Sequence, residues 1–290
     1  MGPQGAGVRS GRKGQGALNL KRCALKFGIA SVLDRHDAVD RYDHSSLRHV
    51  IYAGAPMYRV DQVHALRKLG KVLVQYFGLG EVTGNITVLP SRLHTEEDDP
   101  GYPIGSVGMS RTGMEVAILD PHGNRLGAGE TGEICVRGPA VFAGYWNNPE
   151  ATAAAFRDNW FHTGDLGHLN DQRFLWITGR ASDMFISGGS NVYPREIEEA
   201  LLLHPDVAEA CVVGMPHPKW GESGVAVIVL RPGASASAPD LLAHLDGRLA
   251  RYKRPTEVVF WPELPKSGYG KVPKLQVRRQ LEEARAPLVS

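Results

Sequence analysis

Trp-Phe-His-Thr-Gly-Asp-Leu-Gly at residues 160–167 is followed by Thr-Gly-Arg at 178–180 and by Asp-Met-Phe-Ile-Ser-Gly-Gly-Ser-Asn-Val-Tyr-Pro-Arg-Glu-Ile-Glu at 183–198. A Thr-Gly-Asp triplet alone carries little information, because aspartate beside glycine is common in turns. The combination is more specific: an arginine follows the aspartate by 15 residues, and a double glycine then leads into a helix that starts at Tyr-Pro. This segment is therefore the most informative part of the chain.

The composition is that of a folded protein with one large domain or two ordinary ones. The chain has 290 residues, of which 42% are apolar and 22% are charged. Residues 1–33 carry six Lys or Arg and no acid, which leaves a net charge of −4 for the remainder of a chain whose overall charge is +2. A mildly acidic body gives no reason to expect nucleic acid as a partner. No apolar run reaches about 18 residues, so we expect no membrane span.

The cysteines and the N-terminus bear on location. Cys23, Cys135 and Cys211 lack metal-ligand spacing and cannot all pair, which fits a reducing compartment and predicts a cytoplasmic protein. Residues 1–44 have no sustained periodicity, and their N-terminal part is basic without a continuous apolar region, so we do not expect a secretory signal. We expect a disordered or artificial leader at 1–44, with a transit peptide as the alternative.

Hydrophobic periodicity divides the rest of the chain into three groups of elements. A strand, a helix and a strand at 47–54, 60–70 and 71–76 indicate part of a parallel sheet. Short strands and one helix follow, and then a small α+β unit. The ranges in order are strands at 114–120, 132–138 and 174–179 with a helix at 149–156, then a helix at 193–203, strands at 207–215 and 225–230, a helix at 239–252, a strand at 257–261 and a loop at 264–274.

Three further motifs accompany the 160–198 segment. They are Gly-Ala-Pro at 54–56, Gln-Tyr-Phe-Gly-Leu-Gly-Glu-Val-Thr at 75–83 and Leu-Pro-Lys-Ser-Gly-Tyr-Gly-Lys at 264–271. Together with that segment they closely resemble the adenylate-forming enzymes, the acyl-CoA synthetase and luciferase superfamily. In that family a carboxylate attacks the α-phosphate of ATP to give an acyl-adenylate, the small C-terminal domain rotates, and the CoA thiol displaces AMP. The resemblance covers about residues 45–290.

This resemblance implies a fold and an activity. The fold is α/β plus α+β: part of a large adenylate-forming domain at 45–180, with a mixed sheet and a small β subdomain, then a small mobile α+β C-terminal domain at 181–290. The activity is that of an AMP-forming carboxylic acid–CoA ligase for fatty or aryl acids, with ATP, Mg²⁺ and coenzyme A. The chain carries no signal for one particular acid or for an oligomeric state.

Asp165 and Arg180 are implied to hold the nucleotide. A carboxylate can accept two hydrogen bonds, which suits the neighbouring hydroxyls of a ribose. The resemblance assigns Asp165 to the ribose and Arg180 to the ribose and phosphate region. The alternatives are a turn aspartate after Gly164 and an arginine in a surface salt bridge.

The segment 75–83 is implied to contribute an aromatic ring and a metal ligand. Phe77 would stack on adenine, and Glu81 would supply an oxygen to the Mg²⁺ that bridges the phosphates of ATP. Gly80 stands where the family usually has a threonine that touches the α-phosphate, although Thr83 is near in sequence. The alternative is a plain strand end with Phe77 in the core. The nucleotide-site residues implied by the resemblance are Gly54, Ala55, Pro56, Tyr76, Phe77, Gly78, Glu81, Asp165 and Arg180.

The C-terminal motifs are implied to act in turn. Lys271 matches the catalytic lysine of the adenylation step, where it would neutralise charge on the attacking carboxylate and the α-phosphate. The alternative is a solvated basic tail. Gly188 and Gly189 would face CoA after the domain rotates, and Ser182 is the hinge candidate. The histidines have no metal-ligand spacing and are interpreted as ordinary loop or surface residues.

One family motif is missing from the sequence. Relatives carry a Ser/Thr- and Gly-rich loop ending in Pro-Lys-Gly that cradles the β- and γ-phosphates, and Gly-Arg-Lys-Gly-Gln-Gly at 11–16 lacks its hydroxyl residues and its flanking strand. We therefore expect a truncated C-terminal half, with apolar surface exposed where the missing sheet would pack. Two alternatives stay open: an inactive fragment, and an adenylation domain that loads a carrier protein.

Overall fold

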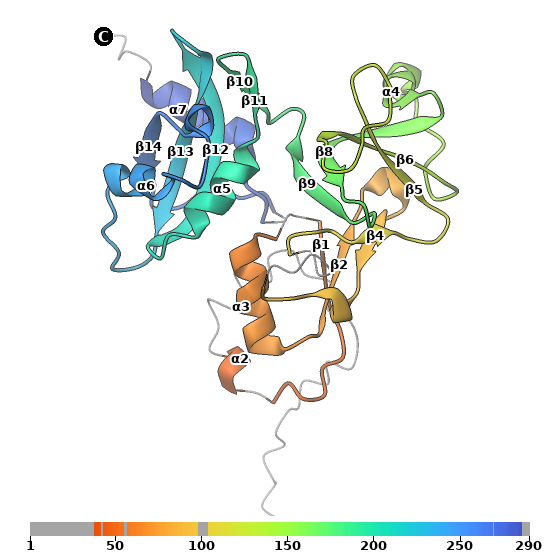
Figure 1. Ribbon diagram of the computed structural model, residues 1–290, viewed down its shortest axis with the longest axis horizontal. Coiled ribbons are helices and arrows are strands. Elements are labelled where there is room, and N and C mark those ends of the chain that lie inside the picture. Colours follow the sequence, from red (N-terminus) through yellow and green to blue (C-terminus); the bar gives the residue numbers. More distant parts are fainter. Residues whose placement is uncertain (1–37, 42, 55–56, 98–103, 269, 286–290) are drawn as a thin grey trace, which may run out of the picture.

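The computed structural model describes residues 38–41, 43–54, 57–97, 104–268 and 270–285. These residues form a mixed α/β structure with three β-sheets and few helices (Figure 1). The predicted leader at 1–44 lies mostly outside the described residues. Its described part contains a short helix, α2 (Ala38–Arg41), which the sequence did not indicate.

The first sheet is built on the strand–helix–strand unit that the periodicity predicts. β1 and β2 pair in parallel, and α3 connects them. Ala65 and Leu66 of the helix pack against Tyr52 and Leu73 of the two strands. Two antiparallel strands extend the sheet in the order β1-β2-β3-β4. The elements are β1 (Val50–Ala53), α3 (Arg59–Leu69), β2 (Leu73–Phe77), η1 (Gly80–Val82), β3 (Thr87–Leu89), η2 (Ser91–Leu93) and β4 (Met109–Ser110).

The second sheet is entirely antiparallel and shares a core with the first. Its order is β5-β6-β8-β7, and β9 pairs with β8. Phe77 and Ile86 of the first sheet region pack in one cluster with Ile134 and Leu175 of the second. The side chain of Asn148 caps α4 by accepting from the Ala151 amide at 3.0 Å. The elements are β5 (Glu115–Leu119), β6 (Gly132–Arg137), α4 (Pro149–Ala155), β7 (Phe156–Arg157), β8 (Trp160–Leu169) and β9 (Leu175–Arg180).

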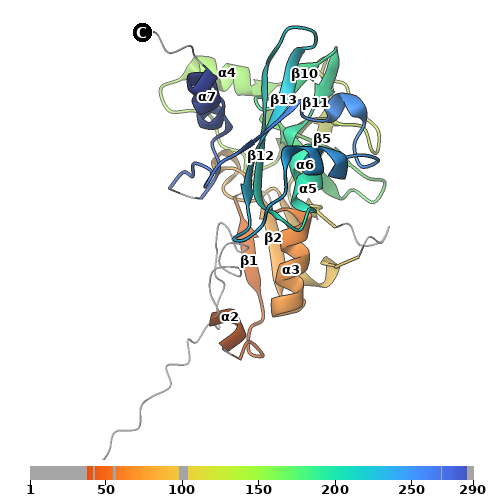
Figure 2. The same cartoon turned by 90° about the vertical axis from the view of Figure 1, so that its left-hand side faces the viewer.

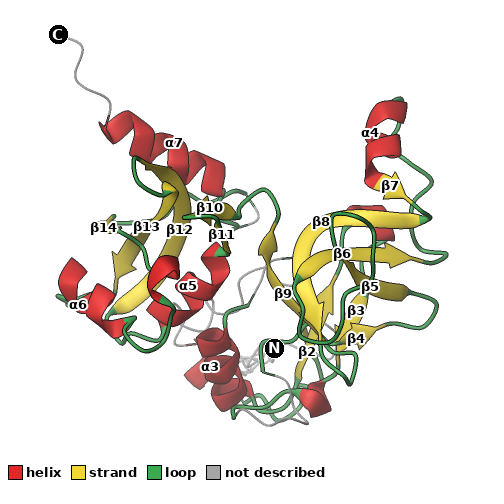
Figure 3. Cartoon of the chain, turned by 45° about the horizontal axis from the view of Figure 1, so that its top comes forward, coloured by secondary structure: helices red, strands yellow, loops and turns green. Residues whose placement is uncertain are grey.

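Residues 185–285, called the C-terminal unit below, form the third sheet and its helices (Figure 3). Val212 and Ile228 face the helices α5 and α6, whereas Val213 and Val227 face α7 on the other side of the sheet. Because both faces are covered, the two long strands read as nearly continuous apolar runs. The elements are β10 (Phe185–Ser187), β11 (Ser190–Val192), α5 (Pro194–Leu202), β12 (Val207–His217), β13 (Gly221–Leu230), α6 (Ala238–His244), η3 (Arg251–Lys253), β14 (Glu257–Phe260) and α7 (Lys274–Arg285).

Two predicted elements need correction. The helix expected at 239–252 ends at His244, because Gly247 adopts a left-handed backbone (φ +74°) that an α-helix cannot contain. The loop expected at 264–274 gives way at Lys274 to α7, whose Val277 and Leu281 are buried one turn apart. A helix with only two buried side chains leaves a weak periodic pattern, which explains why it escaped detection.

Two findings bear on location. Within the described ranges, no helix combines the length and the apolar character that crossing a membrane requires. Cys135 and Cys211 are buried free thiols, and Cys23 lies outside the described residues. The cytoplasmic location expected from the cysteines stays a prediction.

Candidate active site

The β8–β9 hairpin brings Asp165 and Arg180 together. The two residues are direct partners in the antiparallel register, and Nε of Arg180 lies 3.1 Å from Oδ1 of Asp165. The 15-residue spacing in the sequence is therefore the length of one hairpin. The turn alternative for Asp165 is wrong, because the residue lies within β8.

Asp165 sits in an environment that disfavours its charge. Its side chain is 8% exposed, and burial raises the pKa of its carboxyl above the ordinary value, although the charges of Arg180 and Lys271 act to lower it. A buried carboxylate held beside two cations from separate segments is a common arrangement at functional sites. Lys271 belongs to the C-terminal unit, so a charge from that unit also acts to lower the Asp165 pKa.

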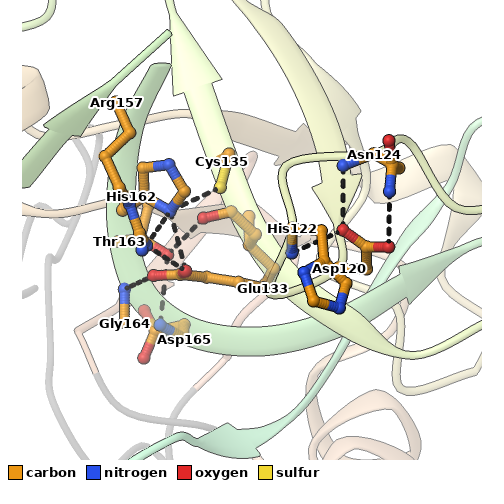
Figure 4. A network of polar contacts seen from close by, with 11 residues as sticks. Asp120, His122, Asn124, Glu133, Cys135, Arg157, His162, Thr163, Gly164 and Asp165 are labelled. Atoms are coloured by element: carbon orange, nitrogen blue, oxygen red, sulfur yellow. Dashed lines mark hydrogen bonds and ion pairs between the residues drawn. The ribbon is translucent and has the colours of Figure 1, made fainter.

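Glu133 of β6 holds the strand that carries Asp165 (Figure 4). Its Oε1 accepts a hydrogen bond from the Gly164 amide at 3.1 Å, and its Oε2 lies 2.7 Å from Nδ1 of His162. Thr163 contributes a second fixed point, since its hydroxyl donates to the Ile134 carbonyl (2.7 Å) and accepts from the Asp165 amide (3.1 Å). Side-chain contacts on both sides therefore fix the Thr-Gly-Asp backbone. No motif in the sequence predicts this role for Glu133.

His162 belongs to a polar cluster that sequence spacing did not reveal. The potential ligand atoms of Glu133, Cys135 and His162 lie within 4.8 Å of one another. The guanidinium of Arg157 is 2.7 Å from Nδ1 of His162 and 3.2 Å from Glu133, so a positive charge already lies against the group. Burial raises the pKa of Cys135 to about 12, which keeps the thiol neutral. We interpret the cluster as a hydrogen-bonded support of β8 rather than a metal site.

Glu133→Ala is expected to lower the free energy of unfolding by roughly 1–3 kcal/mol, because the Gly164 amide and His162 lose a charged partner. Urea denaturation of the full chain measures this. Glu115→Ala is the matched control, since Glu115 lies in the same sheet and pairs with Arg125 and Arg137 at the surface. Exposed ion pairs contribute about 0–1 kcal/mol. Equal losses in the two variants would contradict the supporting role of Glu133.

The predicted nucleotide residues of the first sheet lie at the carboxyl ends of its two parallel strands. Ala53 pairs with Tyr76, so Gly54 and the residues after Tyr76 leave the sheet at the same edge. Ligands of open α/β sheets commonly bind at such an edge. Ala55 and Pro56, which were predicted to line the adenine pocket, lie outside the described residues.

Phe77 and Gly78 are placed by packing. Phe77 is only 8% exposed and belongs to the core shared by the two sheets, whereas Tyr76 on the other face of β2 is partly exposed. A Cβ on Gly78 would lie 1.9 Å from the carbonyl oxygen of Gly84, so only glycine fits there. At Gly80, in contrast, a Cβ would meet nothing within 4 Å. The fold therefore has room for the threonine usual at this position.

Glu81 lies in η1 and is partly exposed. Its Oε1 accepts a hydrogen bond from the Tyr145 hydroxyl at 3.1 Å, and its backbone carbonyl accepts from the Phe142 amide at 2.8 Å. An accessible carboxylate oxygen suits a hard divalent cation, so the residue fits the Mg²⁺ role expected of it. The hydroxyl of Thr83 donates a hydrogen bond to the Ala140 carbonyl at 2.8 Å, so the protein itself already engages this hydroxyl.

Lys271 lies in an exposed, hydrogen-bonded turn. The amide of Ser267 donates to the Lys271 carbonyl at 2.8 Å, and the Ser267 hydroxyl accepts from the Lys271 amide at 3.2 Å. Lys274, three residues on, pairs with the buried Glu198 of α5. Lys274 is therefore not part of a solvated basic tail, since its side chain is only 20% exposed, whereas Lys271 is exposed and its role stays a prediction.

The turn between β10 and β11 carries Gly188 and Gly189 beside an open cavity of about 950 Å³. The Gly188 amide donates to the Trp220 carbonyl at 2.9 Å, and a Cβ there would lie 3.0 Å from the Trp220 ring. Trp220 and Tyr252 are 44% and 50% exposed. The residues that line the cavity include two aromatic and three cationic side chains: Trp220, Tyr252, Lys219, Arg251 and Arg254.

Ser182 lies where the chain crosses from the second sheet to the C-terminal unit. Its side chain is exposed, and its hydroxyl donates only a long hydrogen bond of 3.4 Å to the neighbouring Asp183. The amides of Asp183 and Met184 donate to the Arg180 carbonyl. The crossing is thus a single short turn. The hinge role stays a prediction.

Comparisons with known proteins identify the family of the chain. The profile of the AMP-binding enzyme family matches residues 23–146, and that of the AMP-binding enzyme C-terminal domain matches residues 196–271. A feruloyl-CoA synthase from Amycolatopsis sp is 39% identical over 91% of this chain and 53% of the relative. FadD8 of Mycobacterium tuberculosis, a medium/long-chain-fatty-acid–CoA ligase, is 39% identical over 88% of this chain and 45% of the relative.

This chain belongs to the AMP-binding enzyme family. Among solved structures, the amide bond synthetase McbA from Marinactinospora thermotolerans has a TM-score of 0.82 at 34% identity, over 89% of this chain and 51% of that one. The chain spans about half the length of the relatives that it matches.

The AMP-binding enzyme profiles cover only part of the candidate site. Their ranges contain Glu81 and Lys271, but the Asp165–Arg180 hairpin and the Gly188–Gly189 turn fall between them. Those residues are therefore supported by their arrangement in the fold. Asp165 and Arg180 lie in the second sheet, Glu81 follows β2 of the first, and Lys271 lies in the C-terminal unit.

Proposed function

We propose that this chain carries the ribose-holding, lysine and CoA-facing parts of an AMP-forming carboxylic acid–CoA ligase. One observation carries the proposal: the buried Asp165 pairs with Arg180 across the β8–β9 hairpin, and Lys271 of the C-terminal unit adds a further charge that acts to lower the Asp165 pKa. The site thus forms between residues 45–180 and 181–290, which we propose move against each other about Ser182. The named acyl-CoA ligase relatives support this activity.

In the first half-reaction, Asp165 accepts hydrogen bonds from the two ribose hydroxyls of ATP, and Arg180 adds a positive charge at the ribose and phosphate side. Lys271 stabilises negative charge as the substrate carboxylate attacks the α-phosphate. Glu81 would hold Mg²⁺, which supplies charge neutralisation on the phosphates when bound. Tyr76 is partly exposed near the end of β2, whereas most of the Phe77 ring is in the core. Either ring can face adenine only through its exposed part.

In the second half-reaction, the unit turns so that Gly188 and Gly189 reach the site and admit the pantetheine arm of CoA. The neighbouring cavity fits the nucleotide end of CoA, because an aromatic face stacks on a base and cations neutralise phosphates. Trp220 and Tyr252 supply the rings, and Arg251 and Lys219 supply charges. Arg254 is also at the cavity, where it pairs with Asp246.

Trp220→Ala is expected to raise KM for CoA by about tenfold, since loss of one stacking contact costs roughly 1–3 kcal/mol. The KM for ATP should stay unchanged. Steady-state kinetics with each substrate varied in turn measure this. Trp146→Ala is the matched control, because Trp146 is 90% exposed and lies outside the cavity. Equal effects of Trp220→Ala on both KM values would contradict the CoA assignment.

The proposal is tested by two coupled assays on the full chain. Carboxylate-dependent ATP–pyrophosphate exchange reports the first half-reaction, and CoA-dependent AMP release with thioester detection reports the second. A panel of aryl and fatty acids covers the substrate classes of the named relatives. Exchange with acyl transfer only to a carrier protein would favour a carrier-loading domain. No exchange with any acid would favour an inactive fragment.

A further inference from the structure

A contact between the start of α3 and α5 joins the first sheet to the C-terminal unit, and α3 lies directly against α5 in Figures 1 and 2. Tyr58, the residue before α3, packs against the core of the C-terminal unit. Its hydroxyl donates to Oε2 of Glu198 at 2.9 Å. Burial, and then the charge of Glu198, raises the pKa of Tyr58 well above its ordinary value, so the hydroxyl keeps its proton and remains a donor.

Glu198 is a buried carboxylate with partners from three separate segments of the chain. It is 3% exposed and lies on α5. Besides Tyr58, it accepts from the Val212 amide of β12 at 2.8 Å and from the ammonium of Lys274 at the start of α7. Lys274 and Glu198 form an ion pair. Burial acts to lower the pKa of Lys274, but the neighbouring groups, Glu198 first among them, raise it by more, so the net shift is upward.

Lys274 connects this pair to the active-site lysine. It also donates to the Val212 carbonyl at 3.0 Å, which fixes the start of α7 against β12. The turn with Lys271 ends directly before α7. Tyr58, Glu198 and Lys274 therefore form a continuous set of contacts from the first sheet to the base of the Lys271 turn.

Two neighbouring contacts reinforce the same joint. The amide of Arg59 donates to Oε2 of Glu199 at 3.1 Å, and the guanidinium of Arg195 donates to the Met57 carbonyl at 3.2 Å. The same guanidinium lies 5.8 Å from the centre of the Tyr58 ring. These contacts join the segment after the Gly-Ala-Pro motif to α5 of the C-terminal unit.

We propose that Tyr58 and Glu198 are positioning residues that hold the C-terminal unit in the orientation that presents Lys271 to Asp165. The inference rests on the proposed function and deepens it. When the unit turns to present Gly188 and Gly189, the Tyr58 hydroxyl must leave Glu198. The contact therefore favours the first half-reaction over the second.

Tyr58→Phe tests this, because it removes the hydroxyl and keeps the ring. We expect ATP–pyrophosphate exchange to fall by about tenfold, with thioester formation from supplied acyl-adenylate unchanged or faster. Tyr52→Phe is the matched control, because it also removes one buried tyrosine hydroxyl. The Tyr52 hydroxyl hydrogen-bonds to Gln75 and His94, and neither residue belongs to the C-terminal unit. Equal losses in both half-reactions of Tyr58→Phe would overturn the proposal.

A second readout does not depend on activity. Small-angle X-ray scattering of the full chain should give a larger radius of gyration for Tyr58→Phe than for the wild type and Tyr52→Phe, because the unit is released. Glu198→Gln should give the same change, since it removes the charge that holds Lys274. If the wild type is inactive in both half-reactions, the proposed function fails. The scattering experiment still tests whether the Tyr58–Glu198 contact holds the C-terminal unit in place. Identical scattering of wild type and Tyr58→Phe would overturn it.

Discussion

Lys271→Ala is expected to slow acyl-adenylate formation by roughly 100- to 1,000-fold, the usual cost of losing one group that stabilises charge in a transition state. Thioester formation from supplied acyl-adenylate should change little, because in the proposed rotation of the C-terminal unit the lysine leaves the site. The reason lies in the arrangement of the site: the charge of Lys271 acts on the buried Asp165 beside the place of the ribose. Single-turnover assays of each half-reaction measure the two effects separately.

The matched control is Lys266→Ala. Lys266 lies in the same loop, and its ammonium forms a surface ion pair with Glu209 at 2.7 Å. Its loss removes an equal charge from the loop without touching Asp165, so both half-reactions should stay near wild-type rates. Equal slowing of both steps in Lys271→Ala, or equal effects of the two variants, would contradict a catalytic role for Lys271.

Asp165→Asn is expected to weaken ATP and AMP binding by about 10- to 100-fold, since hydrogen bonds to a charged acceptor contribute roughly 1.5–3 kcal/mol each. Folding stability should not fall with it. The pKa of Asp165 is raised by burial, so the charged form is disfavoured in the folded state and the asparagine removes that cost. Calorimetric titration and urea denaturation of the same samples measure both quantities.

The control for this variant is Asp171→Asn, at the exposed far end of the same hairpin. It should leave affinity and stability unchanged.

The stability of the fold and its affinity for nucleotide should depend on pH in opposite directions. Because the folded-state pKa is raised, Asp165 contributes stability below its unfolded pKa, and this is lost as pH rises through the folded value. Nucleotide affinity runs the other way and declines as pH falls through that value. Unchanged affinity in Asp165→Asn would remove the ribose assignment.

The sequence could predict the parts of the site that depend on local spacing. Asp165 and Arg180 are 15 residues apart because they face each other across one hairpin. The order of strand, helix and strand before Phe77 predicted a parallel pair, and β1 and β2 form it. In each case a short stretch of sequence is enough to predict the arrangement, because the residues belong to one hairpin or to one strand–helix–strand unit.

Other parts depend on contacts between distant segments, which no local pattern encodes. Glu133 supports the Gly164 amide from another strand, and Tyr58 reaches Glu198 across 140 residues. The aromatic position was ambiguous for a similar reason: Phe77 and Tyr76 alternate along β2, and only the packing of the two sheets decides which ring is in the core.

The ribose hydroxyls give the most direct test of the role proposed for Asp165. The affinities of adenosine monophosphate and its 2′,3′-dideoxy analogue should be measured by titration calorimetry for the wild-type chain and for Asp165→Asn. We predict that the wild type binds the complete nucleotide about 10- to 100-fold more tightly than the dideoxy analogue, and that the variant binds both alike. Equal binding of the two nucleotides by the wild type would show that Asp165 does not hold the ribose.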